Sequence, residues 1–265
     1  RKLGDSGLVL SRRLTGGGTV YQDLGNANFG IIAPRSMYDP VRHLQLAAAT
    51  LKKFGLETKI GDQRSLFCEL RKISGSAFML TTATTVQHAT MLIRADLDTL
   101  RSVLRTPPPP IQTNAVESVP AHVANLSEFC DQIDLENFYD ALRQTFAEVY
   151  GIADPLEIVD DKSPRCDTDM FKELYAKYSG DEWILGRTPK FAYVLADDRY
   201  NLRFEVANGK FSAIQCWPDT GLAEKLTAEL EGDFFDPGAI RDALKKTSPQ
   251  HASSLIDKLA RDFGR

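Results

Sequence analysis

Short β-like runs alternate with single helices through the first half of the chain, and this alternation limits the possible folds more than any other feature. The runs read TVYQD, NFGIIAP, ETKIGD, SLFCEL, KISGSAFMLT and TMLIRADLD, between residues 19 and 98. Strands interleaved with helices are typical of α/β and α+β domains. The pattern predicts an α+β domain of the α/β type, in which helices pack on a mixed sheet.

Two predicted helices carry capping signals at their ends. The first, over residues 39–54, has Asp39 as N-cap and Gly55 directly after its last turn. The second, over residues 135–150, begins in the same way after Asp134. An N-cap aspartate accepts hydrogen bonds from free N–H groups of the first turn, and glycine ends a helix without steric cost. The inward faces are predicted to hold Val41, Leu44, Ala48 and Leu51 in the first helix and Phe138, Leu142, Phe146 and Val149 in the second.

The last part of the chain has a different pattern, a β-hairpin followed by helices. The run NLRFEVANGKFSAIQCW alternates apolar and polar residues on both sides of Asn208-Gly209, which is the strongest short signal of a hairpin. Further helices are predicted near residues 169–178, 222–230, 237–246 and 252–263. We place a domain boundary near residue 190, so that residues 1–190 form a large domain and residues 191–265 a small C-terminal α+β domain. The run TPPPP, residues 106–110, is predicted to be an exposed loop inserted within a domain.

Composition excludes several classes of partner. The formal net charge is −4, so no basic excess favours nucleic acid. The four cysteines form no CxxC pair, which argues against zinc and for a reducing compartment. No apolar run approaches the roughly 20 residues needed to cross a bilayer, so no membrane partner is expected. The opening stretch RKLGDSGLVLSRR shows no targeting pattern, and the location in the cell is not given by it.

Three consecutive glycines follow two arginines in SRRLTGGGTVYQDLGN, residues 11–26. Each glycine costs about 0.5–1 kcal/mol relative to alanine, so the backbone geometry must require them. The motif is neither a Walker A loop nor a Rossmann fingerprint, because no Gly-Lys-Ser/Thr and no helix follows. Spacing alone fits a tight turn as well as an anion-binding cradle. Arg13 favours the cradle, because a guanidinium can bind a phosphate through two parallel hydrogen bonds.

Two further strings carry candidate residues. In RKISGSA, Lys72 precedes the small residues Ser74 and Gly75, so a ligand could lie against that strand. An isolated lysine at the start of a strand is, however, usually only solvated. His88 leads into the apolar run TMLIRADLD. A lone histidine is more often structural than catalytic.

In this order the strings resemble the motifs of the lipoate-protein ligase and lipoyltransferase family. The matching segments are RRLTGGGTVYQDLGN, RKISGSA and HATMLIRADL, and DEWILGRTPKF, residues 181–191, looks like the junction before the family's small C-terminal domain. The resemblance implies a biotin/lipoate ligase-like fold. The junction and the proline run look like those of eukaryotic members, fungal ones included, so the resemblance also implies a mitochondrial location.

The resemblance implies a role for each candidate residue. Lys72 matches the family's catalytic lysine, which lies between the activated carboxyl carbon and the phosphate, and Arg13 would hold that phosphate. The remaining residues implied to bind nucleotide and acyl group are Gly17, Gly18, Thr19, Val20, Tyr21, Ser74, Gly75 and His88. The implied substrates and cofactors are ATP, Mg²⁺ and lipoate, joined through a lipoyl-AMP intermediate, and no metal-binding side chains are expected.

The implied reaction attaches lipoate to a lysine of lipoyl-carrier domains, in the E2 subunits of 2-oxoacid dehydrogenases or the glycine-cleavage H protein. Two alternatives stay open: an ATP-independent transferase that uses lipoyl-nucleotide or a lipoylated donor, and a non-catalytic module that binds lipoyl domains. The sequence departs from the family pattern at Leu14, Gln22, Ser65 and Ala89, and each departure could reduce nucleotide affinity.

Overall fold

The structure is a computed structural model that describes residues 7–62, 64–104, 109–115, 121–151 and 155–263. It confirms the α+β class. The chain forms two compact units. We call Arg13–Arg105 with Val116–Ile158 the glycine-loop unit, and Arg1–Arg12 with Thr106–Ala115 and Val159–Arg265 the C-terminal unit. The domain boundary near residue 190 stays a prediction. No helix in the described ranges is long and apolar enough to cross a membrane.

The glycine-loop unit contains two antiparallel sheets. The first has the order β1 (Asn26–Pro34), β6 (Thr84–Leu92) and β5 (Ser76–Leu80). The second has the order β2 (Lys59–Ile60), β3 (Leu66–Cys68) and β4 (Arg71–Ser74). Gly75 alone separates β4 from β5. The string RKISGSA therefore crosses from one sheet to the other, with Lys72 on one side of the crossing and Ala77 on the other.

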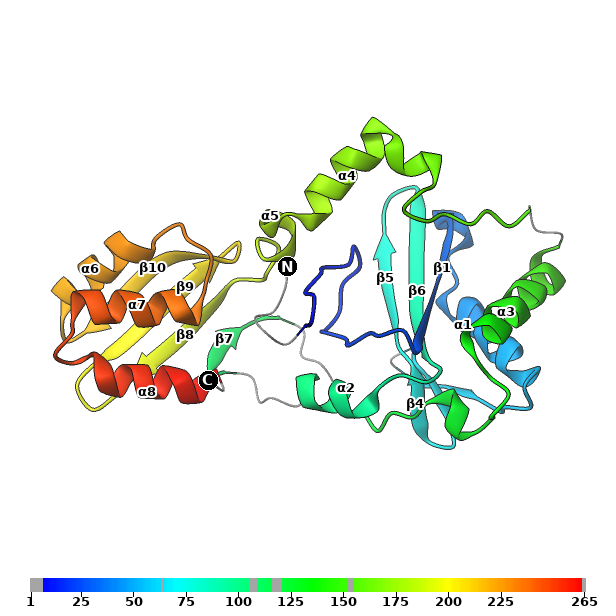
Figure 1. The fold of residues 1–265 in the computed structure, drawn as a ribbon, viewed down its shortest axis with the longest axis horizontal. Coiled ribbons are helices and arrows are strands. Elements are labelled where there is room, and N and C mark those ends of the chain that lie inside the picture. Colours follow the sequence, from blue (N-terminus) through cyan, green and yellow to red (C-terminus); the bar gives the residue numbers. More distant parts are fainter. Residues whose placement is uncertain (1–6, 63, 105–108, 116–120, 152–154, 264–265) are drawn as a thin grey trace. The chain divides into compact units, whose positions relative to one another are not determined.

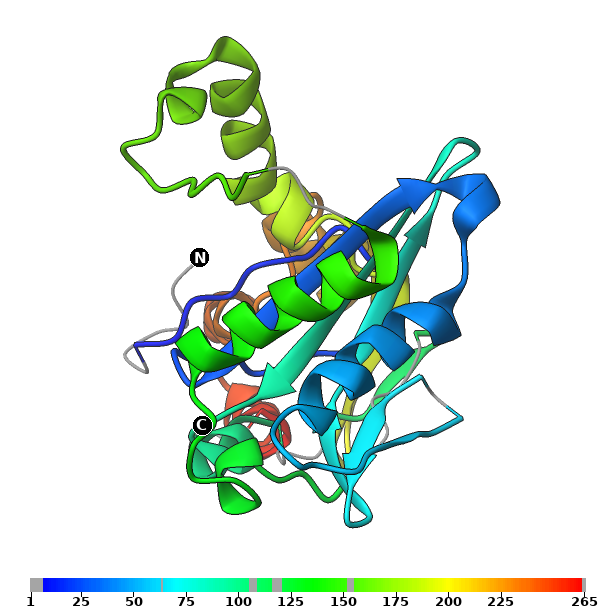
Figure 2. The same ribbon diagram turned by 90° about the vertical axis from the view of Figure 1, so that its right-hand side faces the viewer.

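Two helices cover one face of the β1-β6-β5 sheet (Figures 1 and 2). They are α1 (Pro40–Lys52) and α3 (Leu135–Tyr150), as predicted from their caps. Asp39 accepts hydrogen bonds from the N–H groups of Val41 and Arg42, and Asp134 accepts one from that of Asn137. The core of this unit includes Leu44, Leu51, Leu66, Ile73, Met91, Ile133 and Phe138. Shorter helices in this unit are η2 (Arg35–Met37), α2 (Leu97–Leu104) and η3 (Leu126–Glu128).

The inward faces of both helices were only partly predicted correctly. Val41 is 46% exposed, and Phe146 and Val149 are exposed as well. In α3 the buried residues are Phe138, Ala141 and Thr145. This stripe has the same helical period as the predicted one but is rotated. Contact between α1 and α3 selects it, because small side chains allow close approach and the Thr145 hydroxyl donates to the carbonyl of Ala141 at 2.8 Å.

One predicted strand is wrong. The run TVYQD is irregular, and β1 begins only at Asn26. Its β-like composition is overridden by Asp23, whose carboxylate accepts from the N–H groups of Gly25 and Asp96 and fixes a turn there. The prediction for TPPPP falls mostly on residues 106–108, which lie outside the described residues.

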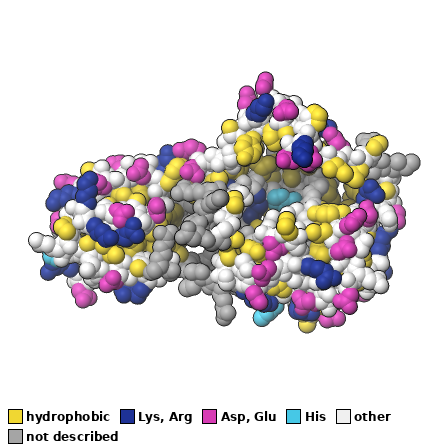
Figure 3. Space-filling view, in the orientation of Figure 1, with side chains coloured by type: hydrophobic (Ala, Val, Ile, Leu, Met, Phe, Trp, Pro, Cys, Tyr) yellow, Lys and Arg dark blue, Asp and Glu magenta, His cyan; other side chains and the backbone are white. Residues whose placement is uncertain are grey.

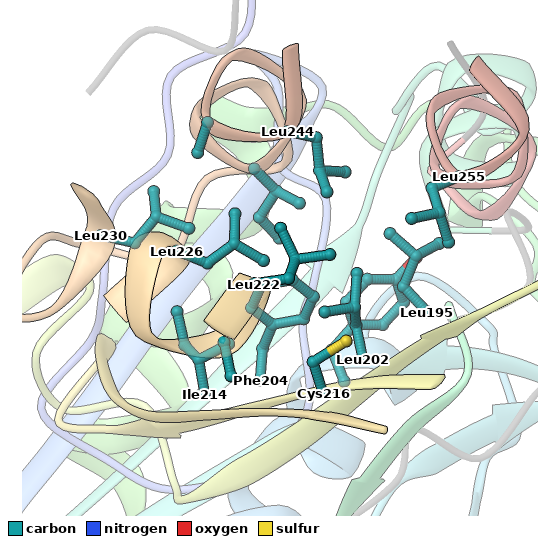
Figure 4. Packing of buried hydrophobic residues seen from close by; sticks show 14 of the residues in the cluster. Leu195, Leu202, Phe204, Ile214, Cys216, Leu222, Leu226, Leu230, Leu244 and Leu255 are labelled. Atoms are coloured by element: carbon teal, nitrogen blue, oxygen red, sulfur yellow. The ribbon is translucent and has the colours of Figure 1, made fainter. Parts of the chain in front are cut away.

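The C-terminal unit has a four-stranded antiparallel sheet of order β10-β9-β8-β7. Its strands are β7 (Ile111–Thr113), β8 (Phe191–Ala196), β9 (Asn201–Ala207) and β10 (Lys210–Trp217). The hairpin is confirmed: Asn208 and Gly209 both have positive φ, at 53° and 72°. The predicted helices are present as α6 (Thr220–Leu230), α7 (Pro237–Thr247) and α8 (Ala252–Asp262). Their leucines pack on the sheet around Phe204 and Leu202 (Figure 4).

Between α3 and β8 the chain forms η4 (Pro164–Asp167), α4 (Asp169–Ser179) and α5 (Asp181–Ile184). Helix α4 buries no side chain, although it is amphipathic and is capped by Thr168. Met170, Leu174 and Tyr175 are exposed, and Figure 3 shows hydrophobic side chains on its surface. The helix is stabilised by its cap, by the stacked rings of Phe171 and Tyr175 on its own surface, and by the edge-to-face contact of Tyr178 with Trp183 of α5.

Candidate active site

A cavity of about 790 Å³ lies in the glycine-loop unit, within the usual range for small-ligand sites. The glycine segment, which is the part of the string SRRLTGGGTVYQDLGN from Arg13 to Gly25 and is also called the glycine loop, is dark blue in Figure 1. It lies on the face of the β1-β6-β5 sheet opposite α1 and α3. The cavity is lined by this segment, by the sheet and by the end of β4. Of the residues predicted from sequence, those that line it are Arg13, Gly17, Gly18, Thr19, Val20, Lys72, Gly75 and His88.

Two predicted residues are not among those that line the cavity, Tyr21 and Ser74. Ser74 is buried, because the pairing of β3 with β4 shifts by one residue between Leu66 and Phe67. That shift removes the alternation that would have placed Ser74 on the same side as Lys72.

Several residues of β1 and β6 line the cavity although sequence reasoning gave them no role. They are Asn28, Phe29, Gly30 and Thr90. The cavity is also lined by Ser76 and Ala77, two of the small residues of RKISGSA, and by Gln22, Ser65 and Ala89, noted only as departures from the family pattern. The register of the sheet explains part of this set. Gly30 and Ala77 are the partners of His88 on its two neighbouring strands. Strand alternation from His88 would have pointed to Thr90.

The glycine segment folds tightly around the guanidinium of Arg13. Arg13 Nη2 donates to the carbonyls of Gly16 at 2.7 Å and Gly18 at 2.9 Å, and Nε also donates to Gly16. Gly17 has a φ of +109°, and a Cβ there would lie 2.6 Å from Nη2. The triple glycine is thus a tight turn whose interior is filled by its own arginine. The turn also sets where the Arg13 charge lies on the cavity wall.

We expect Gly17→Ala to weaken nucleotide binding by roughly tenfold. The substitution strains a left-handed backbone, at about 1–2 kcal/mol, and displaces the Arg13 guanidinium. Gly16→Ala is the matched control, since a Cβ at Gly16 meets nothing within 4 Å. Isothermal titration with ATP measures both. Equal affinities for the two variants would contradict the assigned geometry.

The far end of the glycine segment is fixed to the end of β6. The carbonyl of Gly25 accepts from the N–H groups of Ile93 at 3.1 Å and Arg94 at 2.9 Å. Asp23 closes the turn by accepting from Gly25 at 2.8 Å and from Asp96 at 2.7 Å. The string DLGN therefore serves as an anchor for the loop.

Residues of the string DEWILGRTPKF form hydrogen bonds with Arg12, the residue before Arg13. Arg12 Nε donates to the carbonyl of Ile184 at 2.7 Å, and Arg12 Nη2 to the Thr188 hydroxyl at 3.0 Å. In return the indole N–H of Trp183 donates to the Arg12 carbonyl at 2.8 Å. The tryptophan and threonine of this string are thus explained by a contact inside the C-terminal unit.

Lys72 lies on a backbone held from two sides. Its N–H donates to the carbonyl of His122 at 2.8 Å, and its carbonyl accepts from Ala124 at 3.1 Å, while β3 pairs on the other edge. The side chain folds over Gly75, where a Cβ would lie 3.6 Å from Lys72 Cε and 3.7 Å from Nζ. A larger residue in place of Gly75 would therefore compete with the amine for the cavity wall.

The Lys72 ammonium is half-buried, and burial lowers its pKa below the usual value. Within the described ranges it has no hydrogen-bond or ion-pair partner. A desolvated cation without a counter-charge is unfavourable unless a ligand supplies the missing anion. The cavity therefore contains the positive charge of Lys72, which no described side chain neutralises.

His88 stands on the central strand of the sheet. Its Nε2 lies 2.7 Å from the hydroxyl of Thr15, a loop residue that was not singled out from the sequence. Burial first, and the charge of Arg13 second, hold the pKa of His88 below its usual value, so the ring is neutral at neutral pH. His88 therefore adds no positive charge to the cavity under those conditions.

The lining of the cavity is cationic. Among the described residues that line it, none is an aspartate or glutamate, whereas Arg13 and Lys72 are both present. Ser76 adds a buried hydroxyl oxygen that has no hydrogen-bond partner in the part of the chain that the structure describes. Two cations, a free hydroxyl and close backbone approach at glycines fit an anionic ligand with several acceptor oxygens, such as an acyl-nucleotide.

The fold and the cavity define an α+β protein with a cationic, glycine-rich ligand site. Residues 1–147 match the family model of the lipoyl protein ligase A/B catalytic domain, and the chain belongs to that family. The chain is 29% identical over 266 residues to lipoate-protein ligase A of Psychrobacter cryohalolentis, covering 94% of this chain and 78% of the relative. The predicted lipoate-protein ligase is thereby confirmed, whereas the eukaryotic and fungal origin stays a prediction.

Two solved structures extend the comparison. A lipoate-protein ligase A bound with ATP is 27% identical, with a TM-score of 0.53, over 67% of this chain and 72% of that one. A bi-partite lipoate protein ligase of Thermoplasma acidophilum, studied with its E2 lipoyl domain, is also 27% identical, with a TM-score of 0.50, over 66% of this chain and 69% of that one. Both likenesses support the α+β catalytic fold.

Proposed function

We propose that this chain activates lipoate with ATP and transfers the lipoyl group to a lysine of a lipoyl-carrier domain. The observation that carries the proposal is the Lys72 ammonium, which has no partner among the described residues, in a cavity whose described lining includes Arg13 and no carboxylate. The family, and the ATP bound by a relative of similar fold, support it.

The proposed reaction has two steps. In the first, a carboxylate oxygen of lipoate attacks the α-phosphorus of ATP, and pyrophosphate leaves. In the second, the carrier amine attacks the carbonyl carbon of lipoyl-AMP, loses a proton, and expels AMP. Negative charge grows on the carbonyl oxygen and on the departing phosphate, and the Lys72 ammonium is placed to stabilise both. At an effective dielectric of about 20, a pair of unit charges about 4 Å apart interacts by about 4 kcal/mol, or roughly three decades in rate.

The described residues contain no group of three or more His, Cys, Asp or Glu side chains able to hold a metal. Magnesium is commonly held by substrate phosphates together with one or two carboxylates. We propose that Mg²⁺ would be bound by the ATP phosphates, whose charge it would neutralise.

The affinity for the intermediate is expected to fall at alkaline pH. Burial lowers the pKa of Lys72, so its charge is lost at a lower pH than that of an exposed lysine, and anion binding is lost with it. Titration with a non-hydrolysable sulfamoyl analogue of lipoyl-AMP measures this without any carrier amine. Lys72→Arg should remove the alkaline decline, because arginine stays charged. A decline that persists in Lys72→Arg would assign it to another group.

A pyrophosphate-release assay with lipoate, ATP and a lipoyl domain tests the proposal. Release together with modified domain supports the ligase. Modification only from lipoyl-AMP or from a lipoylated donor would establish the transferase instead. Binding of the domain without either product would leave the non-catalytic module.

Carrier and location are proposals of the same kind. The E2 subunits are supported by the archaeal ligase studied with its E2 lipoyl domain, and the glycine-cleavage H protein by the family resemblance. A mitochondrial location rests on the resemblance to eukaryotic members. Fractionation of source cells, probed with an antibody to the chain, tests it, and enrichment outside mitochondria would reject it.

A further inference from the structure

Thr15 is a loop residue with the burial of a core residue. It is only 7% exposed, although both Leu14 and Gly16 beside it are exposed. Its hydroxyl lies 2.7 Å from His88 Nε2, 73 residues away. This contact joins the middle of the glycine segment to the middle of β6. This hydrogen bond, together with those between Gln22 and Asn28 of β1, joins the loop to the sheet at the cavity.

The sheet leaves room for this contact. His88 lies between Gly30 on β1 and Ala77 on β5, the two smallest residue types. A Cβ at Gly30 would already lie 3.6 Å from that of His88. Larger side chains at these two positions would crowd the imidazole. Because Gly30 and Ala77 are small, the His88 ring can extend from the sheet to the glycine loop.

The charge state of His88 suits the role of an acceptor. A neutral imidazole with its proton on Nδ1 accepts the Thr15 hydroxyl proton at Nε2. Protonation would add a cation close to Arg13, whose charge already opposes it. Either neutral tautomer can make the contact, with Nε2 as acceptor or as donor.

We propose that Thr15 and His88 are positioning residues. Their contact fixes the distance between the glycine loop and the sheet, and so keeps the Arg13 turn in the position that binds the acyl-nucleotide. The inference deepens the proposed function and rests on it. Neither residue takes part in bond making or breaking. Their loss leaves the loop to be ordered by the ligand itself, which weakens binding rather than chemistry.

Variants at the two positions separate positioning from catalysis. Thr15→Val and His88→Leu are each expected to raise the Kd of the sulfamoyl analogue of lipoyl-AMP roughly tenfold, because each leaves a polar group unpaired. At saturating substrates kcat should stay within about threefold of the parent. Thr15→Ser keeps the hydroxyl and should restore the affinity. Thr247→Val, which removes a hydroxyl bonded at 2.8 Å to the Ala243 carbonyl in the C-terminal unit, is the matched control and should change nothing.

The double variant decides whether the residues act as a pair. If they do, Thr15→Val with His88→Leu raises the Kd no more than the larger single change. A double variant whose Kd shows the product of both single effects would overturn the proposal. So would a Thr15→Val variant with the affinity of the parent, or one that loses kcat but keeps its Kd.

Nitrogen NMR of the imidazole tests the contact without any activity. The chain has four histidines, and the His88→Leu spectrum identifies the His88 signals by their loss. The Nε2 resonance should move in Thr15→Val and stay in Thr15→Ser; a resonance indifferent to Thr15→Val would reject the contact. If the NMR result holds and the parent chain fails to bind the analogue, the proposed function is wrong while the contact stands.

Discussion

Replacement of Lys72 by methionine is expected to lower the rate of lipoyl transfer by roughly 10²- to 10³-fold, because the charge that stabilises the transition state is lost. Methionine keeps the unbranched shape of the side chain over Gly75, so the cavity wall is preserved. Single-turnover transfer from preformed lipoyl-AMP to a lipoyl domain measures the step directly.

The same substitution is expected to raise the melting temperature. The pKa of Lys72 is lowered in the folded chain, which means that folding disfavours the charged form. At pH values below the folded pKa, the charge costs stability, and methionine removes that cost. Lower activity with higher stability shows that the loss is chemical. Transfer at the parent rate would remove Lys72 from the mechanism.

Replacement of Gly25 by alanine is expected to cost about 1–3 kcal/mol of stability, or more, because the chain has no room for a methyl group there. A Cβ at Gly25 would lie 2.1 Å from the carbonyl oxygen of Arg94 and 2.7 Å from the nitrogen of Ala95. Both atoms are backbone, and the two hydrogen bonds to the Gly25 carbonyl hold them close. Chemical denaturation measures the change in the free energy of unfolding.

The glycine segment supplies the control for this experiment. Gly16→Ala meets no atom within 4 Å and should change the free energy of unfolding by less than about 1 kcal/mol. Gly25→Ala should also reduce ATP binding, because Gly25 anchors the loop that carries Arg13. A Gly25→Ala variant as stable as Gly16→Ala would show that the end of β6 is less rigid than its hydrogen bonds indicate.

The parts of the fold that could be predicted from sequence are those set by neighbours in the chain. Asp39 and Asp134 predict the starts of their helices, and Asn208-Gly209 predicts its hairpin, because caps and turns depend only on residues a few positions apart. Which side of α3 faces inward depends on α1, and local periodicity does not contain that information. For the same reason TVYQD was predicted as a strand, since its partner in the turn, Asp96, lies 73 residues away.

The candidate site follows the same division. Arg13, Gly17 and Lys72 stand out because their residue types are costly or charged in a β-rich setting, and the structure places all three on one cavity. Thr15 gives no such signal: threonine is ordinary in a loop, and its partner His88 is known only when the sheet is assembled. Ser74 was predicted to lie at the site but does not line the cavity. The shift in the pairing of β3 with β4 that turns it away cannot be predicted from the alternation of residues along a strand.

Strand β6 faces two environments with successive residues. His88 reaches the loop, whereas its neighbour Gln87 bonds to buried His43 on α1 at 2.8 Å, and Met91 lies in the core. Inserting one residue into this strand would exchange the two sets and damage binding and folding together. Attempts to change the length of the acyl chain that is accepted should therefore leave the length of β6 unchanged.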